Sequence, residues 1–427
     1  MLVIWLHWIL SLRTDEILMV LGVLLLVDAP RYAYSAVLMA FWDTVRSLCT
    51  GRLPGPETGA YAYCPPVSVI IAGYNEADTI AKTMESVWNR YPCAQMIVVD
   101  DGSNDGMTDA AKKFAAGRPG ILVIRRDRRG GKSSALNIGL HYATSEIIVT
   151  VDADSRLSEN AIYELLQPLQ DPKVAAVSAT VLAWNPLASL AAFLQAYEYR
   201  QTIFISRMSR GRIGMLGIVS GAFGAFRTSV LKQLGGWDVG PGEDGDLILR
   251  IRKAGHRVGV APYANCFTNV PTSWVRLFWQ RCRWDRTVIS FECRKHEEMG
   301  FPWSANFRWS NFCLMLERWF FNVVCVYTFW LYGIWILTEY PGGALNLLAL
   351  LYCCGLCIEL LQMLVLLFYS DRLKHDLLLC LALPLYPFYQ VFMKAVDIFA
   401  LTREIFSRVS GDDNFVPLHV RKATWRW

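Results

Sequence analysis

Acidic residues stand in four short motifs whose types and spacing could hold a metal ion or accept a proton. Three follow apolar, β-rich runs and one opens a helical pattern: Gly73-Tyr-Asn-Glu76, Asp100-Asp-Gly-Ser103, Asp152-Ala-Asp154 and Gly242-Glu-Asp-Gly245. Carboxylates that meet at one edge of a sheet repel each other unless a cation joins them. A hard divalent ion, which prefers oxygen ligands, is the natural partner.

The Asp152-Ala-Asp154 motif is the best suited to a metal ion. Its two carboxylates are two residues apart, so on an extended chain both can point the same way. They supply few protein ligands and leave positions for water and phosphate oxygens. This suits Mg²⁺ or Mn²⁺ that carries a nucleotide diphosphate. One such motif alone is more typical of a solvated turn between a strand and a helix.

A basic, glycine-rich stretch at 125–132 could contribute to an anion site. It reads Arg-Arg-Asp-Arg-Arg-Gly-Gly-Lys and precedes a helical pattern over Ser133–Tyr142. The amides of Gly130 and Gly131 could approach an anion, which a helix start also favours. The stretch lacks the spacing of a P-loop. Taken alone, it also fits a charged surface loop.

The motif Gln280-Arg-Cys-Arg-Trp284 joins basic residues to an indole. As a helix, it places Gln280, Arg283 and Trp284 on one face, and Trp274, Phe278 and Cys282 on another. The arginines could neutralise a diphosphate, and the indole offers a flat surface for a sugar ring. The pattern also fits an amphipathic helix on a membrane surface, and one helix can serve both purposes.

Short β-rich runs alternate with helical patterns between residues 67 and about 260. The predicted strands are Val67–Ala72, Met96–Asp100, Ile121–Arg125, Ile147–Val151 and Val174–Leu182. Helical stretches separate the first four, which predicts an α/β fold with a mainly parallel, Rossmann-like sheet covered by helices. Ligands of such sheets bind beyond the carboxyl ends of the strands, where the acidic motifs lie.

The composition indicates a membrane part beside this domain. The chain has 427 residues, of which 54% are hydrophobic and 19% charged, against about 25% charged in ordinary soluble domains. This excludes a disordered chain, a coiled coil and a nucleic-acid-binding protein that depends on charge. The net charge of +5 is modest.

Four apolar segments are long enough to be membrane candidates: Ile17–Trp42, Trp319–Leu337, Ala344–Tyr369 and Leu377–Leu401. The first contains Asp28 and Arg31, which are costly in lipid unless they pair or face protein. The last is broken by two prolines, so a re-entrant or interfacial path is an alternative to a full crossing. The loop at 371–375 is basic, and cytoplasmic loops carry an excess of Lys and Arg, so we expect this loop to be cytoplasmic.

The predicted organisation has five parts. They are an N-terminal membrane part (1–50), a linker (51–66), a cytoplasmic catalytic domain (67–290) with interface helices near 190–208 and 272–286, a C-terminal transmembrane region (291–401) and a basic tail (402–427).

The motifs together resemble those of membrane-embedded family 2 glycosyltransferases. Asp101, Asp152-Ala-Asp154, Glu243-Asp244 and Gln280-Arg-Cys-Arg-Trp284 match, in order and spacing, the D, D-x-D, E/D-D and Q-x-x-R-W set of that group. Cellulose, chitin, hyaluronan and poly-N-acetylglucosamine synthases belong to it, and the last branch looks closest. The segment Val219–Arg227 also resembles the group's acceptor-site segment. The resemblance covers roughly residues 65–290 and implies a GT-A-type domain.

The resemblance also implies a role for each matching residue. The implied donor-binding residues are Tyr74, Glu76, Asp100, Asp101, Lys132, Asp152, Arg281 and Arg283. The first four would line a uracil pocket, and the two arginines would face the diphosphate. Asp154, with Asp152, would bind Mg²⁺ or Mn²⁺.

On the acceptor side, Asp244 would be the general base, with Glu243 beside it. Trp284 would hold the terminal sugar of the acceptor, near Gln280, Ser220 and Gly221. Gly242 stands where many members of the group have threonine, and glycine is also common there.

The leading expectation is a processive, inverting polysaccharide synthase in the inner or plasma membrane. It would transfer a hexose from UDP-GlcNAc or UDP-glucose to a growing β-linked glycan and export the product. The expected partners are the UDP-sugar, the nascent glycan and the bilayer. An accessory subunit or a second copy of the chain is compatible with the sequence, and no nucleic-acid partner is expected. The alternatives are transfer of one sugar to a membrane lipid, and a non-catalytic sugar-nucleotide sensor or membrane scaffold.

Overall fold

The computed structural model describes residues 30–51, 54–56, 61–238, 242–305, 307–339, 342–412 and 416–420. The chain divides into two compact units. We call Pro56–Leu316 with Ala400–Trp427 the sheet unit, and Met1–Gly55 with Glu317–Phe399 the helical unit.

The sheet unit contains one eight-stranded sheet in the order β3-β2-β1-β4-β7-β6-β8-β5. The four strands from β3 to β4 are mutually parallel, and β7 is antiparallel to both of its neighbours. Strand β6 pairs with β8 in parallel, and β5 pairs with β8 in antiparallel. The strands are β1 (Val67–Gly73), β2 (Gln95–Asp100), β3 (Ile121–Arg125), β4 (Ile147–Asp152), β5 (Arg156–Leu157), β6 (Val174–Ala183), β7 (Phe223–Arg227) and β8 (Arg257–Thr268).

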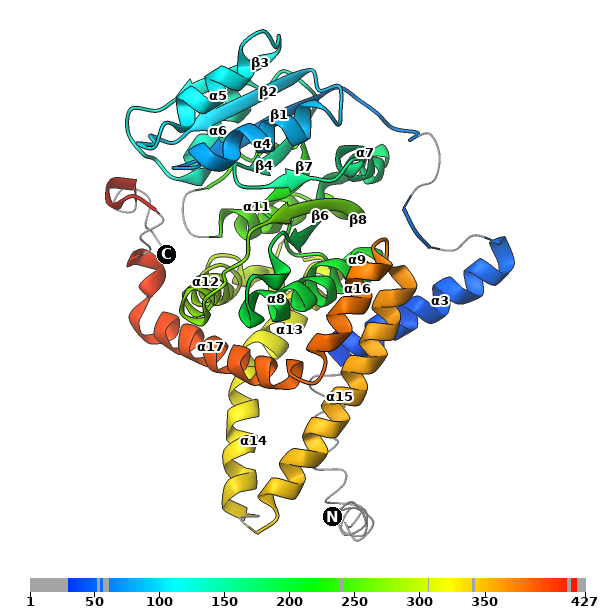
Figure 1. Ribbon diagram of the computed structural model, residues 1–427. Helices are drawn as coiled ribbons and strands as arrows, with labels where there is room; N and C mark the ends of the chain where they lie inside the picture. Colours follow the sequence, from blue (N-terminus) through cyan, green and yellow to red (C-terminus); the bar gives the residue numbers. More distant parts are fainter. Residues whose placement is uncertain are drawn as a thin grey trace. The chain divides into compact units, whose positions relative to one another are not determined.

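The register aligns the ends of the central strands. Gly73 of β1 lies opposite Asp100 of β2, and Ala72 lies opposite Asp152 of β4. In Figure 1 these three strands lie side by side, so the residues that follow them share one edge of the sheet. The predicted mainly parallel α/β sheet is confirmed.

Three strands were not predicted from the sequence: β5, β7 and β8. The two residues of β5 are too few to form a pattern. Strand β8 contains Pro262, and its pairing with β6 jumps from Ser178–Val260 to Thr180–Asn265. A bulge of this kind accommodates the proline and breaks the alternation on which strand prediction depends.

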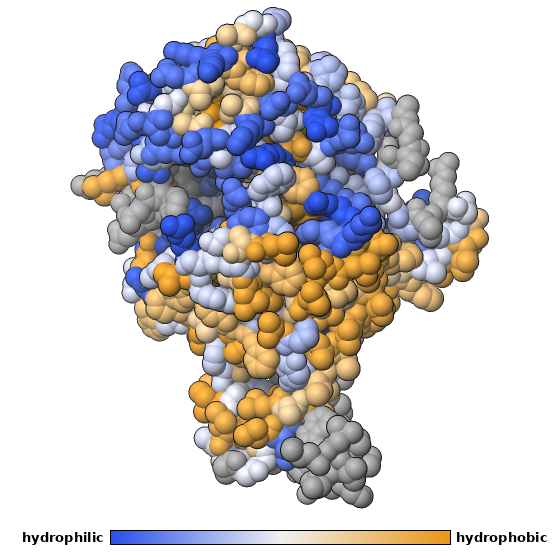
Figure 2. Space-filling model, viewed as in Figure 1, coloured by the Kyte–Doolittle hydropathy of each residue, from blue (hydrophilic) through white to orange (hydrophobic). Residues whose placement is uncertain are grey.

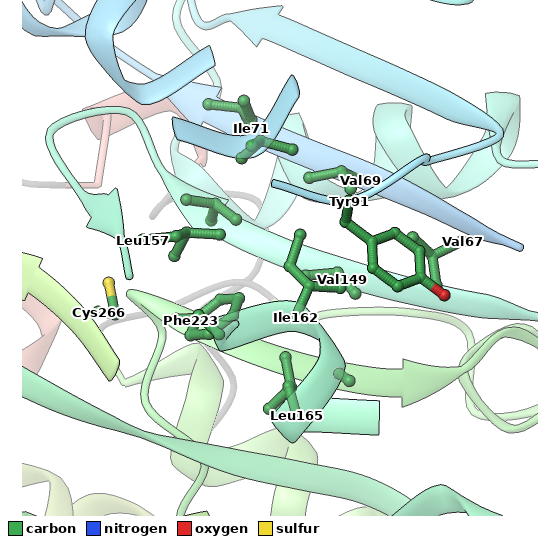
Figure 3. Close-up of a cluster of buried hydrophobic side chains, with 14 of the residues drawn as sticks. Val67, Val69, Ile71, Tyr91, Val149, Leu157, Ile162, Leu165, Phe223 and Cys266 are labelled. Carbon is green, nitrogen blue, oxygen red and sulfur yellow. The ribbon is translucent and has the colours of Figure 1, made fainter. Parts of the chain in front are cut away.

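Helices cover both faces of the sheet. Side chains of β1 alternate: Val67, Val69 and Ile71 belong to the core beneath α4, α5 and α7, whereas Ile70 and Ala72 belong to the core beneath α6 and α11. Figure 3 shows part of the first core, where Ile162 and Leu165 of α7 lie near Val149 and Phe223. The helices are α4 (Ala77–Trp88), α5 (Met107–Ala115), α6 (Lys132–Tyr142), α7 (Ala161–Leu166), η3 (Gln167–Gln170), α10 (Thr228–Gln233) and α11 (Glu243–Lys253).

Two longer helical segments lie where interface helices were predicted. One is formed by α8 (Leu190–Tyr199), η5 (Arg200–Ile205) and α9 (Ser206–Arg212), and the other by α12 (Trp274–Thr287) and η6 (Val288–Lys295). Helix α12 exposes Trp274, Val275 and Trp279 while it buries Cys282, so Trp274 and Cys282 do not share the environment expected for them. Shorter elements are η4 (Pro186–Ala188), η7 (Glu297–Gly300) and α13 (Trp309–Trp319), the last of which ends in the helical unit.

The helical unit supplies the membrane candidates. Among the described residues, the helices over Trp309–Glu339 and Ala344–Tyr369 are long and apolar enough to cross a membrane. The pair Leu373–Ala382 and Tyr386–Ser407 is bent by 76°, as a broken span or re-entrant loop would be. Hydrophobic residues predominate on the visible surface of α14 and α15 (Figure 2). The elements of the helical unit are η2 (Pro30–Tyr34), α3 (Ser35–Thr50), η8 (Phe320–Val324), α14 (Cys325–Glu339), α15 (Ala344–Tyr369), α16 (Leu373–Leu379), η9 (Cys380–Ala382) and α17 (Tyr386–Ser407). The last residues of α17 belong to the sheet unit, as does η10 (Val409–Asp412).

Polar groups inside the helical unit pair with each other. Arg31 Nε lies 3.1 Å from Glu317 Oε1, so the expected costly arginine is neutralised across the chain. Asp28 and the part of the predicted first segment before Pro30 lie outside the described residues. Gln390 Nε2 donates to Glu359 Oε1 at 2.9 Å, a bond of the kind that joins helices in membranes.

We expect Gly139→Ala to destabilise the sheet unit, because this glycine lets α6 lie close to β1. A Cβ atom there would be 2.4 Å from Ile70 Cγ2, too close without a shift of the helix. Overpacking of this kind costs about 1–3 kcal/mol, so the thermal unfolding midpoint should fall. Gly245→Ala is the matched control, since nothing lies within 4 Å of its Cβ position. Equal midpoints for the two variants would refute this close packing.

Candidate active site

The loops after β1 and β2 hold each other in place. Asn75 has a left-handed backbone (φ +59°), and its N–H donates to Ser103 Oγ at 2.8 Å. In return, the N–H of Asn104 donates to Asn75 Oδ1 at 3.0 Å. Asn75 was not among the predicted site residues. Its signal is that asparagine adopts the left-handed conformation more readily than most residues.

Asp100 and Asp101 are both buried and accept hydrogen bonds from their own fold. Asp100 accepts from the N–H of Ser103 at 2.8 Å and from the hydroxyl of Thr108. These bonds shape the loop between β2 and α5.

The side chain of Asp101 binds the backbone of the glycine-rich loop. Its carboxylate accepts from the amides of Gly130 and Gly131 at 2.8 and 2.7 Å, and from Arg126 Nη1 at 2.8 Å. The two glycine amides therefore bind a carboxylate of the chain itself, where the sequence suggested an external anion. Asp101 thereby fixes the start of α6.

Tyr74 and Glu76 lie on either side of Asn75 in the first loop. The guanidinium carbon of Arg129 lies 4.2 Å from the centre of the Tyr74 ring. Glu76 accepts from Thr79 Oγ1 at 2.8 Å. Burial raises the pKa of Glu76, and the charges of Asp154 and Asp152 shift it in the same direction, so this carboxylate lies in their field.

Lys132 joins acidic residues from two elements. Its ammonium forms an ion pair with Asp152 at the end of β4 and lies 3.9 Å from Glu243 at the start of α11. It also donates to the carbonyl of Gly221 at 3.2 Å, and the N–H of Gly221 donates to Asp244 Oδ2 at 3.2 Å. We call Lys132, Asp152, Glu243 and Asp244 the acid–lysine cluster.

The electrostatics of the cluster follow from its burial. Burial raises the pKa of Glu243 to about 7, with Asp244 and Asp152 adding to the shift and Lys132 opposing it. Burial also raises the pKa of Asp152 against the effect of Lys132. For Lys132, burial lowers the pKa, but Asp152 and Glu243 outweigh it and the net shift is upward. The ammonium therefore stays charged.

Asp154 continues the strand end beyond Asp152. Its Oδ2 accepts from Thr268 Oγ1 of β8 at 3.4 Å. Among the residues that the structure describes, no group of three or more acidic, His or Cys side chains could hold a metal ion by itself. Asp152 and Asp154 offer carboxylate oxygens, the ligand type that Mg²⁺ and Mn²⁺ prefer.

The segment before β7 brings Ser220 and Gly221 to the cluster. Arg207 of α9 donates to Ser220 Oγ at 2.7 Å and to Ser178 Oγ at 2.9 Å. A Cβ atom at Gly221 would be 3.0 Å from Lys132 Nζ and 3.5 Å from Asp244 Oδ2. The sequence did not single out Arg207, because its two partners are 29 and 13 residues away in the chain.

The predicted motif helix is α12, and its C-terminal end contacts the segment that precedes Glu243. Gly242 has a left-handed backbone (φ +84°), and a Cβ atom there would be 2.8 Å from Thr287 Cγ2 and 2.9 Å from a ring carbon of Phe291. A threonine, found here in many members of the resembled group, does not fit this arrangement.

The predicted residues of α12 differ in exposure. Trp284 is 39% exposed, whereas Arg281 is buried, and its Nη2 lies 2.6 Å from Glu198 Oε2 of α8. The side-chain oxygen of Gln280 is buried and has no hydrogen-bond partner in the described part of the chain. Arg283 is partly buried.

A second buried network supports α11 one turn after Glu243. Asp246 is within 2.9 Å of His296 Nε2, 2.7 Å of Lys295 Nζ and 2.8 Å of Arg250 Nε. Despite its burial, the bonds from His296 and Lys295 lower the pKa of Asp246. The network ties the start of α11 to η6. Asp246 is the next acid after the predicted pair, but its partners could not be identified from spacing.

A half-parallel, half-mixed sheet whose central strands end in acids is the GT-A type of glycosyltransferase fold. The fold is shared with a mannosyltransferase from Pyrobaculum calidifontis, solved in complex with GDP-Man and Mn²⁺. That structure aligns with a TM-score of 0.58 at 21% identity, over 91% of this chain and 99% of the other.

Residues 65–287, more than half of the chain, match the family model described as "Glycosyltransferase like family 2", and the chain belongs to this family. It is 30% identical over 221 residues to a poly-beta-1,6-N-acetyl-D-glucosamine synthase of Staphylococcus aureus (51% of this chain, 53% of that one). It is 28% identical over 273 residues to the synthase of the same name from Staphylococcus epidermidis (62% and 64%). The chain thus spans about half to two-thirds of the length of these relatives. The predicted family is confirmed.

We expect the stability gained by Glu243→Gln to depend on pH. Glu243 has a folded pKa of about 7 against an ordinary value of 4.5, so the folded protein binds this proton more tightly than the unfolded chain. The free energy of folding that this tighter proton binding contributes is fully present below about pH 4.5 and is lost as the pH rises through about 7. The unfolding midpoint of the glutamine variant, relative to wild type in EDTA, should therefore be higher at pH 8 than at pH 5.

The control for this measurement is Glu85→Gln, which removes an exposed carboxylate of α4. Its midpoint relative to wild type should not change between the two pH values. A Glu243→Gln difference that is the same at both would contradict the raised pKa.

Proposed function

We propose that this chain transfers a hexose from UDP-GlcNAc or UDP-glucose to the end of a growing β-linked glycan, with inversion at the anomeric carbon. One observation carries the proposal: Lys132 brings the strand-end aspartate Asp152 and the acidic start of α11 into a single cluster. Inverting transfer needs a base on one side of the anomeric carbon and positive charge at the leaving diphosphate on the other. The staphylococcal relatives, by their names, make a β-linked N-acetylglucosamine polymer.

On the donor side, Tyr74, Glu76, Asp100 and Asp101 would form the nucleoside end of the site. The backbone bonds of Asp101 to Gly130 and Gly131 suggest that it acts by shaping the loop as well as by facing the base. Lys132 and Arg283 would hold the diphosphate, and Asp152 would contact the ribose or the sugar. Lys132 already forms an ion pair with Asp152. A bound diphosphate would therefore share the positive charge of Lys132 with this aspartate.

Asp154 and Asp152 would hold Mg²⁺ or Mn²⁺ together with the donor phosphates. The ion would supply positive charge to the leaving diphosphate. The protein's contribution is to keep the two carboxylates two residues apart at the sheet edge, with Thr268 bonded to Asp154.

In the transfer step, the Asp244 carboxylate would accept the proton of the acceptor hydroxyl as that oxygen attacks the anomeric carbon. The bond from this carbon to the phosphate oxygen then breaks, and UDP leaves with the electron pair. The amides of Gly221 and Gly245 bond to Asp244 at 3.2 and 2.8 Å and hold it in place. Glu243 would assist beside it, and Trp284, Gln280, Ser220 and Gly221 would bind the acceptor.

Processive elongation and export across the membrane complete the proposal. Among the described residues, two helices could cross a membrane, and a bent pair could add a third. The exposed Trp274, Val275 and Trp279 of α12 suit a helix that touches lipid. The basic loop near Lys374 favours a cytoplasmic position for the sheet unit.

The direct test incubates the purified full chain, in lipid nanodiscs with Mg²⁺ or Mn²⁺, with a panel of UDP-sugars. We expect UDP release with one hexose donor and a ladder of products that linkage-specific hydrolases digest. A single product, with one sugar attached to a lipid, would refute processive elongation and support transfer of one sugar to a membrane lipid. If the protein bound UDP but released no UDP from any donor, the proposed transferase activity would be refuted and the non-catalytic sugar-nucleotide sensor would be favoured.

We expect Asp244→Asn to keep UDP binding and lose transfer. The amide preserves the shape of the side chain but cannot accept the proton, and a positioned base contributes about 10²–10⁴-fold to the rate. UDP affinity by calorimetry and turnover by UDP release give the two readouts. The matched control is Asp109→Asn on the exposed side of α5, which should turn over like wild type. Full turnover by Asp244→Asn would remove this residue from the mechanism.

We expect transfer to stop in EDTA and to return with Mg²⁺ or Mn²⁺. Asp154→Asn should require more metal for half-maximal activity, by about tenfold or more, because it removes a charged ligand. Calorimetric titration of Mn²⁺ in the presence of UDP gives a second readout. Unchanged Mn²⁺ affinity in the variant would exclude Asp154 as a ligand.

A further inference from the structure

The buried ion pair between α8 and α12 lies directly beside Trp284. Arg281 Nη2 and Glu198 Oε2 are 2.6 Å apart, with side chains 11% and 13% exposed. Removing one partner of such a largely buried ion pair is costly. The pair therefore holds the Arg281 guanidinium against Glu198.

The same guanidinium covers the indole of Trp284. Its central carbon is 4.6 Å from the centre of the Trp284 ring and 5.7 Å from that of Tyr199. Arg281 and Trp284 are three residues apart on α12, the spacing at which helical side chains are neighbours. A planar guanidinium stacks on an indole in a way that the compact ammonium of lysine does not match.

Trp284 nevertheless keeps 39% of its surface exposed. With one side of the ring beneath Arg281, the exposed remainder is the surface that a sugar can reach. The ion pair fixes the position of the guanidinium, and the guanidinium in turn fixes the orientation of the indole. Glu198 is thus connected to the acceptor site although it belongs to a different helix.

We propose that Glu198 and Arg281 are positioning residues for the acceptor, which hold the indole of Trp284 so that it presents one face to the terminal sugar of the glycan. The inference rests on the proposed function and refines it. Arg281 then belongs to the acceptor side, and not to the diphosphate as the motif suggested. Reaching a diphosphate would require Arg281 to break its 2.6 Å contact with Glu198.

The test uses the full chain in nanodiscs, with Arg281→Lys, Glu198→Gln and the double variant. The acceptor KM is measured with a β-1,6-linked N-acetylglucosamine pentasaccharide at saturating UDP-GlcNAc, and the Kd of UDP by calorimetry with Mg²⁺. We expect each single change to raise the acceptor KM about tenfold and leave the Kd of UDP within twofold. The double variant should resemble the singles, since the pair acts as one unit.

Two matched arginine variants of α12 serve as controls. Arg276→Lys, on the exposed first turn, should change neither constant. Arg283→Lys, at the position proposed for the diphosphate, should raise the Kd of UDP. Trp284→Ala should raise the acceptor KM at least as much as Arg281→Lys.

A tenfold weaker UDP affinity with an unchanged acceptor KM in Arg281→Lys would make Arg281 a donor ligand and overturn the inference. Unchanged constants in both single variants, or effects that multiply in the double variant, would also overturn it. In these cases the wild type still transfers sugar and the proposed function stands. A wild type that transfers no sugar would overturn the proposed function and this inference together.

Discussion

The ammonium group of Lys132, among partly buried carboxylates, is the interaction on which the site depends. Lys132 contacts Asp152 from the sheet and lies close to Glu243 from α11, two elements that would otherwise bring like charges together. Like charges in a partly buried place are costly, and a nearby cation offsets part of that cost. Asp101 and the glycine-rich loop place this lysine beside the two acids.

The placement of Lys132 is the work of backbone geometry. Asp101 binds the two glycine amides that precede the lysine, so β2 determines where α6 begins. Gly139 then lets the helix lie against β1, and Gly221 leaves room for the lysine side chain. The left-handed Gly242 lets the chain just before α11 pass close to Thr287, the last residue of α12. The donor-side acids and the helix that bears Trp284 are thereby connected through Gly242.

The sequence was most informative where local chemistry and local structure coincide. Buried parallel strands form continuous apolar runs, so β1, β2 and β4 could be predicted, and with them the acids at their ends. Strand β8 could not be predicted, because its bulge and Pro262 interrupt the pattern. The spacing of the motif helix α12 placed Gln280, Arg283 and Trp284 correctly on a helix, but it did not predict that Arg281 would be buried against Glu198, 83 residues earlier in the chain.

Long-range pairing explains the other omissions. Arg207, Arg126 and Lys295 gain their roles from partners that only the folded chain brings near them, such as Ser220, Asp101 and Asp246. Asn75 is the exception, since its residue type alone suggests the left-handed turn that it adopts. In the helical unit, hydropathy identified the two long helices, whereas the partner of Arg31 could not be read from its own segment.

The central claim, that Lys132 and the acid of α11 stabilise each other, is tested most directly by a double-mutant cycle of Lys132→Met and Glu243→Gln. Unfolding free energies are measured in EDTA at pH 8, above the pKa of about 7 for Glu243. The account predicts that Lys132→Met is clearly more destabilising in wild type than in the Glu243→Gln background, with a coupling of about 1 kcal/mol or more. Effects that add to within about 0.5 kcal/mol would contradict it.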